Sequence, residues 1–271
     1  MAQTMLGAVL WQLGYPDQAR ARFRQAIAWG QELDQPSSLA FSHFMAMMTT
    51  SVLGRDLATA LGHHQALRPL GQLNLVYGAW AELLSALEQT QAGTGSAQVN
   101  CAQGVARTIE ALSSWQSAGS GAGYAALLWL QAEVCVCADQ PELGLEAMDR
   151  AKAWIDRTGM RPMEAEVWRM RGEMLLRLDD RGLASSGVSH PATVAEAEAC
   201  FHRALEVARE QGSRWWELRA AMSLVRLRAR QGEAYVAELA EARGYLQEMV
   251  QGFTEGLALP DLQEAEALIG E

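Results

Sequence analysis

The residues that could bind a metal or transfer a proton are few, and their spacing assembles no site. The five histidines are His43, His63, His64, His190 and His202. A helical zinc site places two histidines four residues apart on one face, and no pair here has that spacing. Adjacent His63 and His64 point about 100° apart on a helix. We therefore expect no bound metal.

The four cysteines are equally uninformative as a chemical site. They are Cys101, Cys135, Cys137 and Cys200. Four cysteines in a chain of 271 residues do not make a disulfide framework, and no further ligands stand at zinc-binding spacing. We expect them to be small apolar residues in a reducing, cytoplasmic protein.

A nucleotide-phosphate loop needs a lysine directly after glycine. Lys152 is the single lysine in the sequence and follows Ala151. Carboxylates are plentiful but fall on solvated faces of predicted helices. The sequence therefore predicts neither catalytic machinery nor a cofactor, and we expect the chain not to be an enzyme.

The charge of the chain disfavours nucleic acid and acidic membranes as partners. The net charge is −10, and hydrophobic residues make up 49% of a chain that can bury a sizeable core. The longest apolar run, 122–138, contains Gln131 and Glu133 and falls short of the roughly 20 residues that span a bilayer. No signal peptide is apparent, so we predict a soluble protein.

Long segments rich in Ala, Leu, Glu, Arg and Gln alternate with short breaks, which indicates helices throughout. In the first pair of segments, Leu6, Gly7 and Leu10 fall on one face of the first helix. Ala19, Phe23 and Ala26 follow Pro16 at spacings of four and three. Small residues let two antiparallel helices approach closely, and the phenyl ring fills the gap. This is the tetratricopeptide pattern.

The small residue of the second helix recurs at fixed intervals. It is found at Ala19, Thr59, Gly104, Gly144, Ala197 and Ala237, at intervals of 40, 45, 40, 53 and 40 residues. The two longer intervals contain insertions, 91–98 and about 13 residues within 180–193, which we interpret as loops. An irregular bundle with accidental spacing is the alternative, and the six registrations argue against it.

We predict an all-α fold, a right-handed superhelical TPR-like solenoid of about six antiparallel helix pairs. One repeat domain would cover 1–271, with repeats at 1–35, 36–70, 72–118, 121–158, 161–211 and 213–252. A short capping helix is expected at 259–269, with Pro260 at its start. Met1 lies inside the first helix of a pair, so we expect the C-terminal part of a longer protein.

Three stretches in the second half resemble the C-terminal region of bacterial class III nucleotide cyclases and AAA (STAND-type) ATPase signalling proteins. They are EAEVWRMRGEMLL (164–176), AEACFHRALEVAREQG (197–212) and WELRAAMSLVRL (216–227), with GFTEGLALPDLQEAEALI (252–269) at the end. The resemblance is looser over 1–120. It implies a TPR-like sensor arm that acts with ATPase or cyclase domains, and it transfers no catalytic residue.

The inner wall of such a solenoid is the expected partner site. Projection of the helix template places there Trp129, Glu133, Glu166, Arg169, Glu173, Arg177, Arg219, Arg226 and Arg230. The last three share one helix face and form a basic stripe. This stripe has two interpretations, a carboxylate or phosphate clamp for a partner peptide, or a solvated face paired with the glutamates of the fifth repeat, 161–211.

The function expected from these features is a protein–protein interaction scaffold, the regulatory arm of a bacterial signalling ATPase, cyclase or transcriptional regulator. Its partner would be a protein or peptide segment in the concave groove, with no direct contact to nucleic acid or membrane. The alternative is a small-molecule effector sensor, which a deep apolar pocket with a few polar groups would favour.

Overall fold

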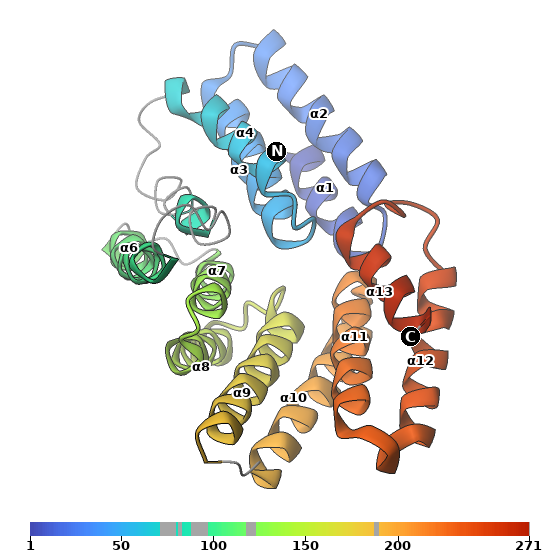
Figure 1. Cartoon of the computed structure of the whole chain (residues 1–271). Helices are drawn as coiled ribbons and strands as arrows, with labels where there is room; N and C mark the ends of the chain where they lie inside the picture. Colours follow the sequence, from blue (N-terminus) through green and yellow to red (C-terminus); the bar gives the residue numbers. More distant parts are fainter. Residues whose placement is uncertain (71–79, 81–82, 88–96, 118–122, 187–189, 271) are drawn as a thin grey trace. The chain divides into compact units, whose positions relative to one another are not determined.

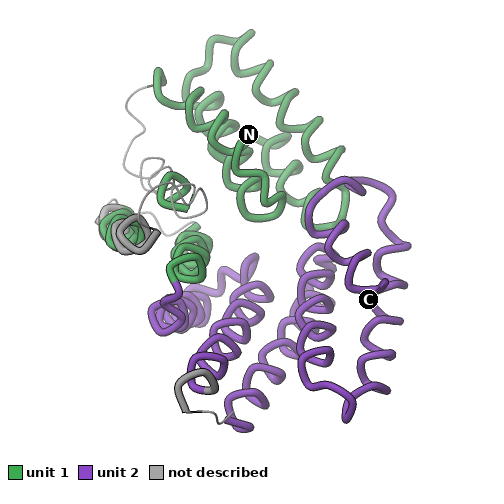
Figure 2. The backbone as a smooth tube through the Cα atoms, in the orientation of Figure 1, with its two compact units in different colours: residues 1–138 green, residues 139–271 purple. Residues whose placement is uncertain are grey.

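The computed structural model describes residues 1–70, 80, 83–87, 97–117, 123–186 and 190–270 of the chain, and these residues form helices and no strand (Figure 1). They divide into two compact units, Met1–Ala138 and Asp139–Glu271 (Figure 2). The continuity of one repeat domain across this division stays a prediction.

Unit 1 consists, over its described residues, of successive helices. Its helices are α1 (Ala2–Gln12), α2 (Pro16–Glu32), α3 (Pro36–Val52), α4 (Leu57–Leu67), the 3₁₀ turn η1 (Arg68–Leu70), α6 (Ala97–Ser117) and α7 (Tyr124–Cys137). Helix α1 packs on α2 and α3, α2 on α3, α3 on α4, and α6 on α7. Phe44 lies against Trp80 and Trp115 in the core of this unit.

Unit 2 continues in the same manner. It contains α8 (Pro141–Thr158), α9 (Glu164–Ser186), α10 (Pro191–Glu210), α11 (Arg214–Gln231), the 3₁₀ turn η2 (Gly232–Tyr235), α12 (Val236–Gln251) and α13 (Pro260–Gly270). Each helix packs on the next, and α9 and α13 both also contact α11 (Figure 1). The predicted C-terminal helix is present as α13.

Local sequence explains where many helices begin. Pro16, Pro36, Pro141 and Pro191 each occupy a first helical position, where the missing N–H leaves no hydrogen bond unmade. Helix α4 begins after Asp56, whose carboxylate accepts a hydrogen bond from the backbone N–H of Thr59 at 3.0 Å.

The close approach expected between paired helices is present in α1/α2. A Cβ atom at Gly7 would lie 3.1 Å from the ring of Phe23 and 3.2 Å from the carbonyl oxygen of Ala19. Ala19, Phe23 and Ala26 are all buried. A glycine is therefore what lets the ring of α2 lie against the backbone of α1.

The pair α9/α10 repeats this arrangement in unit 2. A Cβ atom at Gly172 would lie 2.5 Å from Cε1 of Phe201 and 3.0 Å from the carbonyl oxygen of Ala197. In both pairs the glycine lies against a phenylalanine ring and against the backbone carbonyl group of the residue four positions before that phenylalanine. Gly7 and Gly172 thus occupy equivalent places, and this is the strongest internal evidence for a repeated helix pair.

The other predicted positions of the small repeat residue differ in burial. Gly104 and Gly144 are buried as the template requires, but Thr59 and Ala237 are exposed. At the second position the buried small residue is Ala60, one place later, because Thr59 instead takes part in the Asp56 cap. The template therefore describes the helix pairs unevenly.

The loop expected within 180–193 was wrong at both ends, because 180–186 belong to α9 and 191–193 to α10, while 187–189 lie outside the described residues. Helix α9 continues to Ser186, through Gly182. Asp179 and Arg181 at this end are paired with Arg230 of α11 and Glu142 of α8, and these contacts hold the last turns helical. A single glycine is tolerated inside a helix that is supported by packing. Of the other predicted insertion, 91–96 lies outside the described residues, while 97 and 98 begin α6.

None of the helices in the described part of the chain combines the length and the apolar character needed to cross a membrane.

Candidate functional site: a buried arginine–carboxylate network

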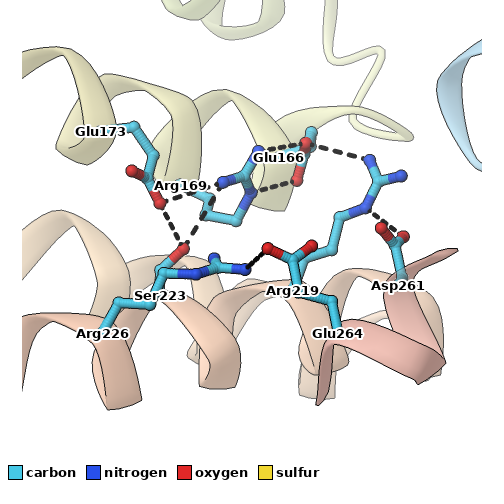
Figure 3. Close-up of polar contacts among 8 residues, drawn as sticks. All are labelled: Glu166, Arg169, Glu173, Arg219, Ser223, Arg226, Asp261 and Glu264. Atoms are coloured by element: carbon cyan, nitrogen blue, oxygen red, sulfur yellow. Dashed lines mark hydrogen bonds and ion pairs between the residues drawn. The ribbon is translucent and has the colours of Figure 1, made fainter. Parts of the chain in front are cut away.

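Three of the predicted partner-binding residues meet in a buried ion network between α9 and α11 (Figure 3). Oε1 of Glu166 accepts a hydrogen bond from Nη2 of Arg169 at 2.7 Å, and Oε2 accepts one from Nε at 2.8 Å. Nη1 of Arg219 donates to Oε1 of the same glutamate at 3.2 Å. Two guanidinium groups therefore hold one carboxylate that has no exposed surface.

Asp261 on α13 joins this network from the other side of Arg219. Its Oδ2 atom accepts hydrogen bonds from Nε of Arg219 at 2.6 Å and from the indole N–H of Trp215 at 2.9 Å. Asp261 is 2% exposed and Arg219 is 5% exposed. The first arginine of the predicted stripe is consequently buried between two carboxylates.

The network continues along α9 towards the solvent. Nη1 of Arg169 donates to Oε1 of Glu173 at 3.2 Å, and the Ser223 hydroxyl donates to the same oxygen at 2.7 Å. Glu173 is partly exposed, so the chain of contacts runs from the interior at Glu166 to the surface.

The other two arginines of the stripe are also paired. Nη2 of Arg226 donates to Oε1 of Glu264 on α13 at 2.6 Å, and both side chains are partly exposed. Nη2 of Arg230 donates to Oδ2 of Asp179 at 2.8 Å, while Asp179 also accepts the backbone N–H of His190 at 2.6 Å. Asp179 thus fixes both α11 and the start of α10 to the end of α9.

The charge state of Glu166 follows from its surroundings. Burial alone raises the pKa of its carboxyl group, but the charges of Arg169 and Arg219 outweigh burial and hold that pKa below the ordinary value of 4.5. A carboxylate held ionised by two arginines is a poor proton donor. The arrangement therefore suits structural pairing or carboxylate recognition better than acid–base catalysis.

A second polar pair lies in unit 1. Nδ1 of His43 on α3 and Nδ1 of His63 on α4 are 3.1 Å apart. Burial, followed by the nearby His63, lowers the pKa of His43 to about 4, and burial lowers the pKa of His63 against the opposing effect of Asp56. One neutral ring therefore donates to the other. Within the described residues, no group of three or more metal-binding side chains is present.

The remaining predicted site residues lie in different surroundings. Trp129 and Glu133 belong to α7 in unit 1, where Trp129 is buried and Glu133 is partly exposed. Arg177 is exposed on α9. Partner binding by any of the nine residues stays a prediction.

Sequence reasoning missed the groups that complete the network, Asp179, Trp215, Ser223, Asp261 and Glu264. Asp261 and Glu264 are three residues apart in a predicted amphipathic helix, and this spacing was the available signal. Their pairing with arginines 42 and 38 residues away has no local signature.

No protein-family model matches the chain, and none of the curated proteins compared with it is detectably similar.

Proposed function

We propose that this chain is a protein–protein interaction module, the regulatory arm of a bacterial signalling protein that binds a segment of a partner. The observation that carries the proposal is the recurrence of one helix-pair geometry at Gly7/Phe23 and Gly172/Phe201. Repeated helix pairs bury each face against a neighbour and leave long rows of helix faces for binding. The resemblance of 164–176 and 197–212 to signalling proteins supports the regulatory role.

The partner surface in this proposal includes the exposed and half-exposed arginines of unit 2. Arg177 on α9 and Arg226 on α11 keep guanidinium surface in contact with water. Arginine grips carboxylates with two parallel donors, so an acidic partner segment suits these positions. Arg219 is a poor test position because it is buried between Glu166 and Asp261, and its loss would take an ionic partner from both buried carboxylates.

The test combines capture with direct binding. The intact chain is used to retain proteins from a bacterial lysate, and the dissociation constant of each purified candidate is then measured. We expect Arg177→Glu/Arg226→Glu to weaken binding at least about tenfold, since charge reversal sets like charges opposite one another.

Arg203→Glu is the matched control, because Arg203 is exposed on α10 and pairs only with glutamates of its own helix, Glu206 and Glu210, in the contacts that the structure gives for it. If the control and the double variant lose the same amount of affinity for the partner, the arginines at 177 and 226 are not part of the binding surface. A chain that retains no protein but binds a small molecule saturably would favour the effector-sensing alternative.

A further inference from the structure

Helix α13 packs on α11, where its acidic side chains meet the arginines of that helix (Figure 3). Asp261 accepts hydrogen bonds from Arg219 and from the Trp215 indole, and Glu264 accepts one from Arg226. Two acidic side chains three residues apart thus meet two arginines seven residues apart on α11. Opposite charges are matched along the contact.

The apolar side of α13 completes the contact. Leu262, Ala265 and Leu268 are buried, and α13 packs on α11 and α12. Nε of Arg243 on α12 donates to the carbonyl oxygen of Leu268 at 3.0 Å, in the last turn of α13, where helix carbonyls lack partners of their own. Side chains of α11 and α12 therefore contact both the charged edge and the last turn of this short amphipathic helix.

The charges of the network are compatible with the departure of α13. Glu166 and Glu173 balance Arg169 and Arg219 when all four are ionised, and Asp261 adds one further negative charge to these four. If α13 left, Arg219 would keep Glu166, while Arg226 and the Trp215 indole would become available. These two arginines and two glutamates would then match in charge, whereas an unbalanced buried charge is the usual obstacle to opening such a site.

The segment that joins α12 to α13 stays anchored at its beginning. Phe253 is buried, its ring lies 5.5 Å from the ring of Trp215, and Arg214 lies over its face at 4.6 Å. Residues 254–259, which follow it, form no helix or strand.

We propose that the Trp215/Arg219/Arg226 face of α11 is a docking site for an acidic amphipathic helix of a partner, and that α13 is its intramolecular occupant. The partner helix carries carboxylates at positions i and i+3 and apolar residues at i+1, i+4 and i+7, like Asp261, Glu264, Leu262, Ala265 and Leu268. This rests on the proposed function and names the partner class. The two helices compete, so partner binding releases α13.

The first test is amide hydrogen exchange of the intact chain. We expect the amides of α13 to exchange through a local opening, with protection at least about tenfold lower than in α11. Glu264→Gln weakens the contact to Arg226 and lowers the protection of α13 further, while Glu248→Gln, an exposed acid on α12, leaves it unchanged. If α13 exchanges only together with α11, it does not open separately and the proposal is overturned.

The second test uses a labelled synthetic peptide of residues 259–270 as the probe. It should bind the intact chain saturably, bind the Glu264→Gln chain at least about tenfold more tightly, and lose binding when its own two acids are amides. Failure to bind the Glu264→Gln chain contradicts the docking site. If α13 does not open separately in hydrogen exchange but a partner protein is captured, this inference alone is contradicted. If the peptide binds but no protein partner is found, the proposed function is contradicted.

Discussion

Nη1 of Arg219 on α11 lies 3.2 Å from Oε1 of Glu166 on α9, with almost no solvent at either side chain. The Glu166 carboxylate accepts three hydrogen bonds from Arg169 and Arg219 in a medium that solvates the two guanidinium groups poorly. Glu166→Gln should therefore destabilise unit 2 by about 3–5 kcal/mol, measured by urea unfolding with amide exchange in α9 and α11.

Glu196→Gln is the control for this substitution. Glu196 also pairs with an arginine, Arg171, but its side chain is 52% exposed. Exposed ion pairs contribute about 0–1 kcal/mol. Similar losses in the two variants would mean that burial does not set the strength of the network.

The His43–His63 pair makes unit 1 sensitive to mild acid. The pKa of His43 is lowered from 6.5 to about 4, so the unfolded chain binds more protons than the folded one between these values. Protonation of His43 therefore does not lower the free energy of unfolding of unit 1 above pH 6.5, but it lowers this free energy as the pH falls towards 4. The pKa of His63 is lowered as well, which gives the same pH dependence.

Replacement of both rings tests this pH dependence. In the His43→Gln/His63→Gln variant, the free energy of unfolding of unit 1 should vary less between pH 7 and pH 4.5 than in the original chain. His202→Gln, an exposed histidine in unit 2, serves as control. Parallel pH profiles for the double variant and the original chain would show that the pair does not carry the dependence.

The approach of Gly172 to Phe201 leaves no room for a methyl group. Gly172→Ala places a Cβ atom 2.5 Å from the ring, and overpacking of this kind costs about 1–3 kcal/mol. Gly62→Ala in α4 should instead stabilise by about 0.5–1 kcal/mol, since no atom lies within 4 Å and alanine favours helix. Thermal unfolding of both variants measures the difference in sign.

Equivalent positions in α1 and α9 differ in burial. Met5 is 49% exposed, whereas Met170, at the same distance before the equivalent glycine, is 2% exposed because α8 and α11 pack on α9. Met170→Ala should cost about 2–5 kcal/mol, and Met5→Ala less than about 0.5 kcal/mol. Urea unfolding at several protein concentrations compares them. A large, concentration-dependent effect at Met5 would show that α1 is covered by another chain in solution.

The sequence by itself determined that the chain is helical, and it predicted the close approach of the first two helices at Gly7 and Phe23. Helix periodicity, proline at first positions and a small residue opposite an aromatic ring are local signals that act within a few turns. The same signals placed α13 after Pro260. They overestimated the break after Asp180, because one glycine weighs less than the tertiary contacts of Asp179 and Arg181.

Only the tertiary structure decided what the arginine stripe does. Spacing put Arg219, Arg226 and Arg230 on one face, but it could not show that their partners are Asp261, Glu264 and Asp179, 38 to 51 residues away. Nor could it show that Glu166 is fully buried while Arg177 is exposed. Pairing over such separations depends on how helices pack, and packing sets the solvation that decides whether a charge is a surface group or part of the core.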